Sequence, residues 1–437
     1  MIDLLKTIGT LALLLIAFPF NLTLVLASLL ISWVTFPFQE KKVIKNPKKI
    51  LLTGGKMTKS LQLARSFYQA GHQVFLVETH KYWLSGHRFS QAVKGFYTVP
   101  APEKDTAGYY QGLLNIVQKE GIDVFIPVSS PVASYYDSVA GTLLSPFCEI
   151  IHFSPDMTKL LDDKFTLCEQ AHLFGLSAPK AFLITDPQEI LEFDFKTDRS
   201  QYLLKSIRYD SVSRLDMTKL PCEEMESYIK DLPISKENPW VMQEFITGQE
   251  YCTHSTVRQG KIRLHCCSSS SPFQVNYEHI EKPEIYEWVE KFVKELNLTG
   301  QISFDFIQAK DGTIYPIECN PRTHSAITMF YNHSGLADAY LKDGNKVIMP
   351  LSGSKPTYWL YHEIWRLTEV RSLADFQAWL QKIIKGTDAI FQLNDPLPFL
   401  TVPHWQITLL LLENLRKLKG WVKIDFNIGK LVELGGD

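Results

Sequence analysis

Candidate oxygen ligands for a metal ion gather in two short segments near residue 310. In residues 301–306 (Gln-Ile-Ser-Phe-Asp-Phe), the alternation of a strand puts Asp305 on the face opposite the apolar side chains. In residues 317–322 (Ile-Glu-Cys-Asn-Pro-Arg), Glu318 and Asn320 are two residues apart and share a face. A Lys-Asp-Gly turn at 310–312 predicts a hairpin that brings these side chains together. Two carboxylates and an amide oxygen suit Mg²⁺, which keeps several waters and takes further ligands from nucleotide phosphates.

For any one of these acids, a solvated position on a surface hairpin would be the ordinary interpretation. Three upstream segments favour the metal site instead. Lys205 interrupts an apolar strand at 202–207, and a lysine in a buried strand needs an anionic partner because burying its charge alone is costly. Residues 240–246 form another apolar strand, which runs into a polar turn and a further acid, Glu250. Earlier in the chain, Lys164 follows two aspartates.

The order of these elements resembles the ATP-grasp superfamily of carboxylate-amine ligases. Five separated elements fall in sequence: Lys164, Lys205, a Gln-Glu-Phe-Ile strand end followed by Glu250, then Asp305, and Glu-x-Asn-Pro-Arg at 318–322. The resemblance implies an α/β chain with the ATP-grasp fold, in which an N-terminal parallel α/β domain precedes two α+β subdomains that clasp ATP. It also implies an enzyme that forms C–N bonds and releases ADP.

The same resemblance assigns nucleotide-binding roles by position. Lys164 and Lys205 would hold the α- and β-phosphates as point charges. The residues assigned to adenine and ribose are Gln243, Glu244, Phe245, Ile246 and Glu250. The first two would face the adenine amino edge, the next two would bond the ring through backbone groups, and the last would accept the ribose hydroxyls.

The resemblance also assigns the metal and the reacting phosphate. Asp305, Glu318 and Asn320 would carry two Mg²⁺ ions, which Mn²⁺ can replace. Arg322 would face the γ-phosphate or the acyl phosphate formed from it.

The loop after Lys205 departs from the family pattern. That loop is usually glycine-rich, so that backbone amides close over the phosphates, whereas residues 206–214 contain no glycine. Serine hydroxyls, Arg208 or Arg214 would have to replace the amides.

The first 40 residues predict contact with a membrane. Between Lys6 and Glu40 there is no charged residue, and a spanning helix needs only about 20 apolar residues. Pro19 interrupts the stretch, which permits either one kinked span or a shallow re-entrant hairpin over residues 7–38. Five lysines between 41 and 49 follow it, so the positive-inside bias places the catalytic body on the cytoplasmic face of the membrane.

The remaining composition limits the class of protein. A formal net charge of -2 gives no nucleic-acid signature, and the sequence carries no signal for oligomeric state. Seven scattered cysteines without a Cys-x-x-Cys pair indicate reduced thiols rather than a disulfide framework or a zinc site. We expect four parts: a hydrophobic segment, an N-terminal α/β domain, the ATP-grasp domain and a C-terminal extension packed on the body, at residues 1–40, 41–150, 151–340 and 341–437.

The second part should hold a parallel sheet. Strands expected at 49–53, 73–78 and 123–128 alternate with a helix at 60–68. The Gly-Gly turn at 54–55 lacks the Walker spacing and is interpreted as structural. Segments at the carboxyl ends of such strands are natural places for the acceptor substrate. The candidates there are His87, Arg88, Ser129 and Ser130.

Within the superfamily, the chain resembles the mycosporine-glycine synthetase family. The stretches that carry this resemblance are the hydrophobic lead and residues 54–59, 82–88, 131–137, 320–326 and 361–366. The implied reaction joins the small molecules glycine and 4-deoxygadusol to give mycosporine-glycine, with ATP converted to ADP and phosphate through a phosphorylated enol.

Several assignments stay open at this point. The base that deprotonates glycine would be His324 or a substrate oxygen, and a His324 hydrogen-bonded within its own loop is equally compatible with the sequence. Arg322 or Arg88 would grip the glycine carboxylate. Two other functions fit the motifs: a peptide-type ligase that uses a true carboxylic acid, and a membrane-tethered nucleotide-binding protein without catalysis.

Overall fold

A five-stranded parallel sheet forms the N-terminal part of the body. The computed structural model describes every residue except 1, 36–43, 130, 208–215, 271–275 and 434–437. The strands are ordered β3 (Val93–Val99), β2 (Gln73–Thr79), β1 (Lys49–Leu52), β4 (Val124–Ile126) and β5 (Glu149–Ile150). Apolar clusters lie on both of its faces, as expected for a parallel sheet covered by helices on each side. The covering helices are α2 (Thr58–Gln69), α3 (Thr106–Glu120) and α4 (Pro131–Leu144). The predicted parallel α/β arrangement is therefore confirmed.

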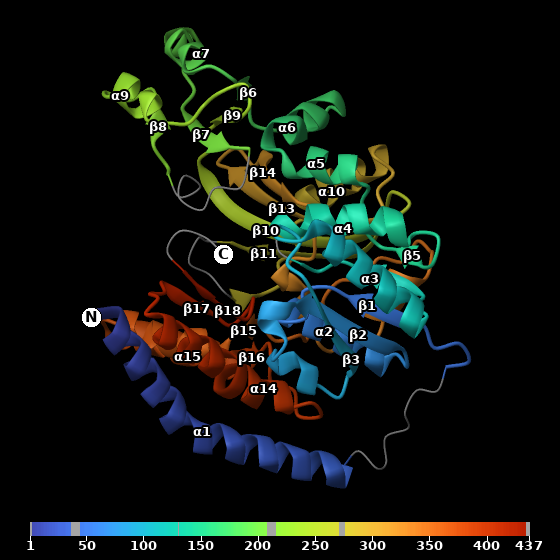
Figure 1. Cartoon of the computed structure of the whole chain (residues 1–437). Helices are drawn as coiled ribbons and strands as arrows, with labels where there is room; N and C mark the ends of the chain where they lie inside the picture. Colours follow the sequence, from blue (N-terminus) through green and yellow to red (C-terminus); the bar gives the residue numbers. More distant parts are fainter. Residues whose placement is uncertain (1, 36–43, 130, 208–215, 271–275, 434–437) are drawn as a thin grey trace.

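Two antiparallel sheets follow, and they are stacked above the parallel sheet in Figure 1. Both have four strands, and the larger, which has the longer strands, has the order β11 (Lys261–Ser269), β10 (Gly248–Arg258), β13 (Gly300–Ala309) and β14 (Ile314–Asn320). Its apolar face packs against α10 (Pro283–Glu295), where the Trp288 ring contacts Phe304 and Phe306. Beside it lie α5 (Pro155–Asp162) and α6 (Lys164–Leu173). Aromatic burial on this face fixes the register, because a shift of one residue would turn the phenylalanines outward.

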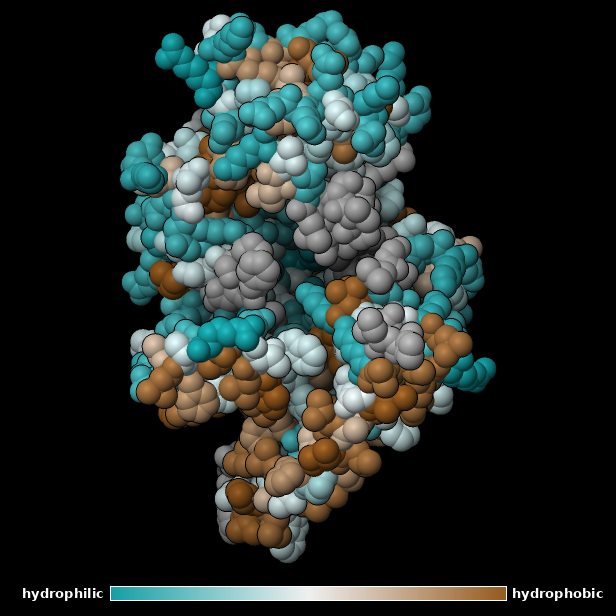
Figure 2. Space-filling view, turned by 90° about the vertical axis from the view of Figure 1, so that its left-hand side faces the viewer, coloured by the Kyte–Doolittle hydropathy of each residue, from teal (hydrophilic) through white to brown (hydrophobic). Residues whose placement is uncertain are grey.

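The smaller antiparallel sheet lies at the top of Figure 1. Its order is β6 (Ala181–Ile184), β9 (Trp240–Glu244), β7 (Tyr202–Ser206) and β8 (Lys219–Leu220). Short helices flank it: α7 (Pro187–Leu191), α8 (Phe195–Asp198) and α9 (Met225–Lys230). On the face seen in Figure 2, the molecule is hollowed between its upper and lower halves, and hydrophilic residues surround the hollow.

The C-terminal residues pack mainly on the parallel-sheet end of the molecule. The remaining elements after residue 275 are β12 (Asn276–Tyr277), η5 (Ser325–Phe330), α11 (Leu336–Leu341), β15 (Thr357–Tyr358), α12 (Leu360–Arg366), η6 (Leu367–Glu369), α13 (Leu373–Lys385), β16 (Thr387–Asp388), α14 (Leu397–Thr401), the π-helix η7 (Val402–Ile407), α15 (Thr408–Lys417), β17 (Lys423–Asp425) and β18 (Lys430–Val432). Arg65 of α2 forms a buried ion pair with Asp395 at 2.7 Å, which ties the two parts together. Short 3-10 turns η2 (His80–Tyr82) and η3 (Gly86–Phe89) lie beside α14 and η7.

The apolar lead forms one helix, α1 (Ile2–Thr35), which is long and apolar enough to cross a membrane. It continues through Pro19 and bends midway along the lower edge of the body (Figure 1). A proline bends a helix because it removes one backbone N–H and crowds the preceding turn. The chain does not reverse at Pro19, so the re-entrant hairpin alternative is wrong.

Candidate active site

The expected metal ligands lie together on the β13–β14 hairpin. Asp305 is paired directly with Glu318 across the strands, and Asn320 is paired with Ser303. Opposite Asp305 and Phe306 the register shifts by one residue, Ile317 of β14. Alternation along β13 places Asp305 on the face opposite Phe304 and Phe306. The predicted hairpin is present, with the left-handed Gly312 in its turn.

The two carboxylates affect each other's ionisation. Burial, followed by repulsion from Glu318 and Glu250, raises the pKa of Asp305 to about 7. Burial alone would also raise the pKa of Glu318, but Lys164, Arg322 and Lys205 outweigh it and lower that pKa. A divalent cation would relieve the repulsion between the acids. Among the described residues, no three His, Cys, Asp or Glu side chains are grouped to hold a metal by themselves. The Mg²⁺ site at Asp305, Glu318 and Asn320 therefore stays a prediction that needs phosphate oxygens and water as further ligands.

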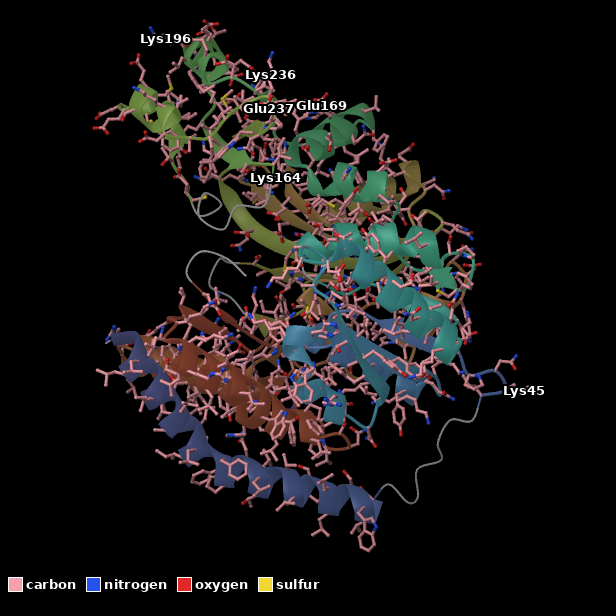
Figure 3. All side chains as sticks on the ribbon, in the orientation of Figure 1. Lys45, Lys164, Glu169, Lys196, Lys236 and Glu237 are labelled. Atoms are coloured by element: carbon pink, nitrogen blue, oxygen red, sulfur yellow. The ribbon has the colours of Figure 1, made fainter. Side chains whose placement is uncertain are left out.

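Both predicted phosphate lysines lie beside these acids. Lys164 begins α6, and its Nζ is 3.7 Å from Oε2 of Glu318. Figure 3 shows Lys164 close below the small sheet. Lys205, on β7, donates a hydrogen bond to Oε1 of Gln243 at 2.9 Å. Burial and then the charge of Lys164 lower the pKa of Lys205 to about 8, so a bound anion would stabilise its charged form.

The predicted adenine residues lie at the end of β9 and in the loop after it. The Gln243 side chain also donates to Sγ of Cys168 at 3.5 Å and is thus shared with Lys205. Glu244 accepts from the backbone N of Lys180 and from Oγ of Ser200. Both side chains are therefore bonded within the protein, and their adenine contacts stay a prediction.

The backbone after Glu244 also forms a hydrogen bond within the protein. The N–H of Phe245 donates to the carbonyl of Gln201, so an adenine ring would have to use the Phe245 carbonyl and the groups of Ile246. Glu250 accepts a long 3.4 Å hydrogen bond from Oγ of Ser270. The Glu250 carboxylate also raises the pKa of Asp305, so the residue predicted to bind ribose lies close enough to interact with the predicted metal ligands.

The loop after β14 carries the predicted catalytic residues. Arg322 donates to Oδ1 of Asn320. His324 accepts from the N–H of Ala326 through Nδ1, so its remaining proton lies on Nε2. Burial and the charges of Lys59 and Arg322 lower the pKa of His324 to about 3. The hydrogen bond within the loop is therefore present, and a general-base role for His324 stays a prediction.

A buried cationic junction joins this loop to the N-terminal domain, and the sequence alone did not single it out. Lys59 of α2 donates to the carbonyl of Thr323 at 2.7 Å and is only 6% exposed. Burial, then Arg322 and Lys56, lower the pKa of Lys59 well below its ordinary value. His254 accepts from the N–H of His324, and its buried Nε2 has no hydrogen-bond partner among the residues that the structure describes. The cations Lys59 and Arg322, with the two histidines, define what we call the cationic junction.

The other predicted substrate residues have local partners. His87 is buried, with Nδ1 at 3.1 Å from the carbonyl of Gly55, and Arg88 donates to the carbonyl of Trp83 at 2.7 Å. Ser129 donates to Oγ1 of Thr53 at 2.6 Å. Ser130 lies outside the described residues, as do Arg208 and Arg214. A substrate role for this group stays a prediction.

Comparison with known proteins identifies the architecture. A family model described as an ATP-grasp domain matches residues 222–326, which include β9–β11 and the hairpin. The same fold recurs in solved structures that cover most of this chain. The chain has the ATP-grasp fold.

Three of these ATP-grasp structures illustrate the likeness. N5-carboxyaminoimidazole ribonucleotide synthetase in its ADP complex is 13% identical, with 73% of this chain and 82% of that chain covered and a TM-score of 0.54. The corresponding synthetase from Staphylococcus aureus with ADP is 16% identical, with 72% and 82% covered and a TM-score of 0.54. Biotin carboxylase from Campylobacter jejuni is 13% identical, with 71% and 75% covered and a TM-score of 0.53. No curated protein matches the sequence.

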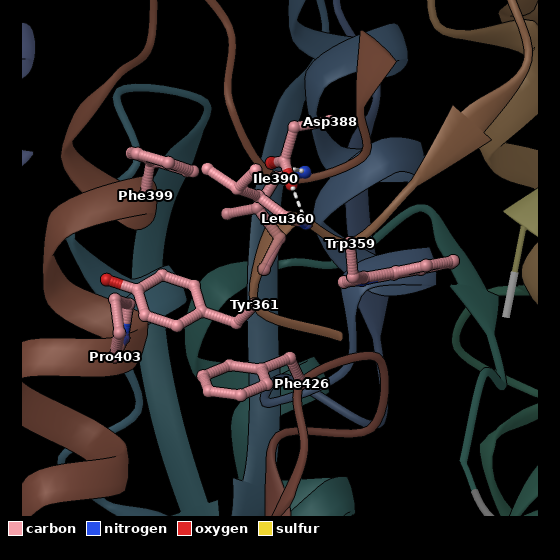
Figure 4. A pocket seen from close by; sticks show the side chains of 8 residues that line it. All are labelled: Trp359, Leu360, Tyr361, Asp388, Ile390, Phe399, Pro403 and Phe426. Carbon is pink, nitrogen blue, oxygen red and sulfur yellow. Dashed lines mark hydrogen bonds between the residues drawn. The ribbon is translucent and has the colours of Figure 1, made fainter. Parts of the chain in front are cut away.

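An apolar pocket elsewhere in this ATP-grasp chain differs from the candidate site (Figure 4). Its lining includes Trp359, Tyr361 and Phe426, and its one acid is Asp388. That carboxylate accepts hydrogen bonds from the backbone N–H groups of Leu360, Ile390 and Phe391. The carboxylate of this pocket is therefore committed to the backbone and is not free to bind a substrate.

Proposed function

We propose that the chain is an ADP-forming ligase that joins glycine to 4-deoxygadusol. The supporting observation is the cationic junction beside the metal hairpin. Lys59 belongs to the stretch 54–59 and contacts Thr323, while Ser134, from the stretch 131–137, donates to the carbonyl of Pro321 at 3.0 Å. Two stretches that resemble the synthetase family thus meet on a third, residues 320–326.

The junction suits an anionic acceptor. Arg322 is close enough to lower the affinity of Lys59 for protons, and the hydrogen bond from Lys59 to a carbonyl does not neutralise its charge. A buried cation without a carboxylate is costly, and an anion bound there removes that cost. The acceptor 4-deoxygadusol is a vinylogous acid, whose enolate oxygen is conjugated to a ketone as a carboxylate oxygen is to its carbonyl.

Phosphorylation makes that oxygen a good leaving group. The enolate oxygen attacks the γ-phosphorus of ATP, the β–γ bridge breaks, and ADP leaves. The glycine amine then adds to the carbon that bears the phosphorylated oxygen, the C–O bond breaks, and phosphate departs with the acceptor oxygen. From glycine ammonium to product the nitrogen loses two protons: the departing phosphate takes one as HPO4²⁻, and the other passes to solvent.

The protein acts by positioning and charge. Asp305, Glu318 and Asn320 would hold Mg²⁺, which when bound neutralises charge on the transferring phosphoryl group. Lys164 and Lys205 hold the nucleotide phosphates. Arg322 is the member of the cationic junction that contacts the metal hairpin, through Asn320, and there it faces the phosphoryl group during transfer. No side-chain nucleophile is needed.

A substrate comparison tests the proposal. The purified full-length chain is incubated with ATP, Mg²⁺ and 4-deoxygadusol, together with glycine, alanine or serine, and the products are measured by mass and ultraviolet absorbance. We expect ADP and phosphate to form in equal amounts with mycosporine-glycine, and only when both acceptor and amino acid are present. ADP formation with a simple carboxylic acid but not with 4-deoxygadusol would assign a peptide-type ligase. Nucleotide binding without any turnover would assign the non-catalytic alternative.

A further inference from the structure

Helix α1 has one face that is fastened to the body. Thr7, Leu14, Asn21 and Ser28 recur at intervals of seven, so they lie on one side of the helix. Leu14 is 5% and Val25 is 1% exposed, and both belong to the apolar cluster of the C-terminal residues. The buried face is therefore a packed interface and not a chance approach of two elements.

Polar contacts hold this face at both ends and in the middle. Near the start, Lys6 donates to the carbonyls of Trp421 and Val422 at 2.9 and 2.8 Å. At mid-helix, Asn21 donates to the hydroxyl of Tyr361 at 2.5 Å. Near the end, Ser32 donates to the carbonyl of Leu393 at 2.7 Å. The helix thus lies along the body over its full length, which is about 50 Å at 1.5 Å per residue.

The opposite face of α1 is apolar and open to solvent. Each of the following side chains is more than 60% exposed: Leu5, Leu13, Leu15, Ile16, Phe20, Leu30 and Trp33. Figure 2 shows this part as a hydrophobic surface at the lower end of the molecule. Contiguous apolar surface on this scale marks a binding surface for a protein or a membrane.

Four hydroxyls in the described part of the helix are satisfied within the helix itself. The hydroxyls of Thr10, Thr23, Ser28 and Thr35 each donate to the carbonyl four residues earlier in α1, at 2.7–2.8 Å. Protein interfaces carry a polar rim and intermolecular hydrogen bonds, whereas hydrocarbon accepts only surfaces whose polar groups are satisfied internally. There is also no charged residue between Lys6 and Glu40. The outward face therefore has the chemistry of a lipid-facing surface rather than of a second protein's docking site.

We propose that α1 lies in the plane of a lipid bilayer, with its outward face in the hydrocarbon boundary and its other face fastened to the catalytic body. The helix does not cross the membrane. A crossing would carry one end away from the body and break the contacts of Lys6 or Ser32, whereas the in-plane position keeps all three attachment points. The exposed ring of Trp405, on η7 beside α1, and the ring of Phe89, which contacts Trp405, would lie at the headgroup level, where aromatic rings are favoured.

Vesicle flotation tests the surface. The full-length protein is mixed with vesicles of phosphatidylcholine and phosphatidylglycerol, and the bound fraction is compared for the wild type, for Ile16→Glu with Leu30→Glu, and for a control with Leu143→Glu and Leu173→Glu. The control leucines are similarly exposed but lie on α4 and α6. We expect the α1 variant to bind at least about tenfold less and the control to bind as the wild type, because a charge in hydrocarbon costs well over 1.4 kcal/mol. Equal binding of both variants would overturn the proposal.

Two further measurements test the alternatives, which are an α1 that crosses the bilayer and a second copy of the chain bound to the outward face. The protein is given an N-terminal epitope tag, bound to vesicles and treated with protease from outside. The protease should remove the tag and also cleave the body, because both lie on the outer side of the vesicle. A tag protected until detergent is added would show that α1 crosses the bilayer and would overturn the in-plane arrangement. Light scattering without lipid should give the same mass for the wild type and the α1 variant. A wild-type dimer that the α1 variant splits, with no vesicle binding, would assign the face to a second copy.

Discussion

The metal hairpin and the cationic junction are neighbouring sites of opposite charge that are assembled in different ways. Asp305, Glu318 and Asn320 come from 16 consecutive residues and meet through strand pairing. Lys59 reaches Thr323 across 264 residues and depends on how the N-terminal domain packs on the hairpin. The metal hairpin forms by local strand pairing and would bind a cation. The cationic junction forms by packing between distant segments and would bind an anion. A ligase needs both, since phosphoryl transfer joins a metal-bound nucleotide to an acceptor oxygen.

The largest effect is expected at the hairpin. Glu318→Gln removes one charge from the metal site and should lower turnover by about 1,000-fold, since a bound metal supplies several kcal/mol of transition-state stabilisation. Steady-state ADP release measures the loss. Glu287→Gln, a change at an exposed position of α10, should leave turnover unchanged. Near-normal turnover of Glu318→Gln would remove Glu318 from the metal site.

At the junction, Lys59→Met should separate acceptor binding from stability. Losing a charge-assisted hydrogen bond to the acceptor should lower kcat/KM for 4-deoxygadusol by roughly 10- to 100-fold. The melting temperature should hold or rise, because the substitution removes an uncompensated buried charge. A control, Lys104→Met, alters an exposed lysine. If Lys59→Met melts lower and its surviving fraction has normal KM, Lys59 is a structural residue only.

Lys205 belongs to the predicted nucleotide site beside the metal hairpin, not to the cationic junction. Lys205→Met should weaken ATP binding by roughly tenfold, the value of one charged hydrogen bond, and leave the KM of the acceptor unchanged. Calorimetric titration with ATP measures this directly. Lys196→Met, at an exposed position in the same part of the molecule, is the matched control. An unaltered ATP affinity would limit Lys205 to its contact with Gln243.

The last effect concerns the pH dependence of stability without nucleotide, and it does not involve catalysis. Burial, then Lys164, lowers the pKa of Lys205 to about 8 from 10.5. Between these values the unfolded chain binds more protons than the folded one, so stability rises with pH. Relative to Lys205→Met, the wild type should gain up to about 1.4 kcal/mol per pH unit from pH 8 to 10.5, as followed by denaturant unfolding. A constant difference across this range would show that the pKa of Lys205 is not lowered.

The sequence predicted the parts of the site that rest on local pattern. Strand alternation was enough to pair Asp305 with Glu318, and an apolar run was enough to mark Lys205 as buried. It could not find Lys59, which follows a turn interpreted as structural and donates to the loop that carries Arg322 only in the folded chain. Nor could it decide between the two roles of His324, because the capping bond from Ala326 depends on the geometry of that loop. Similarly, the continuity of α1 through Pro19 depends on the body against which the helix packs.

The fate of the acceptor oxygen tests the central claim most directly. The wild-type protein is supplied with 4-deoxygadusol labelled with ¹⁸O at the reacting position, together with ATP, Mg²⁺ and glycine. If the acceptor is phosphorylated, one label should appear in inorganic phosphate for each mycosporine-glycine formed, with ADP as the only nucleotide product. Release of AMP and pyrophosphate, or label found in water instead of phosphate, would contradict the account and remove the roles proposed for Arg322 and the metal hairpin.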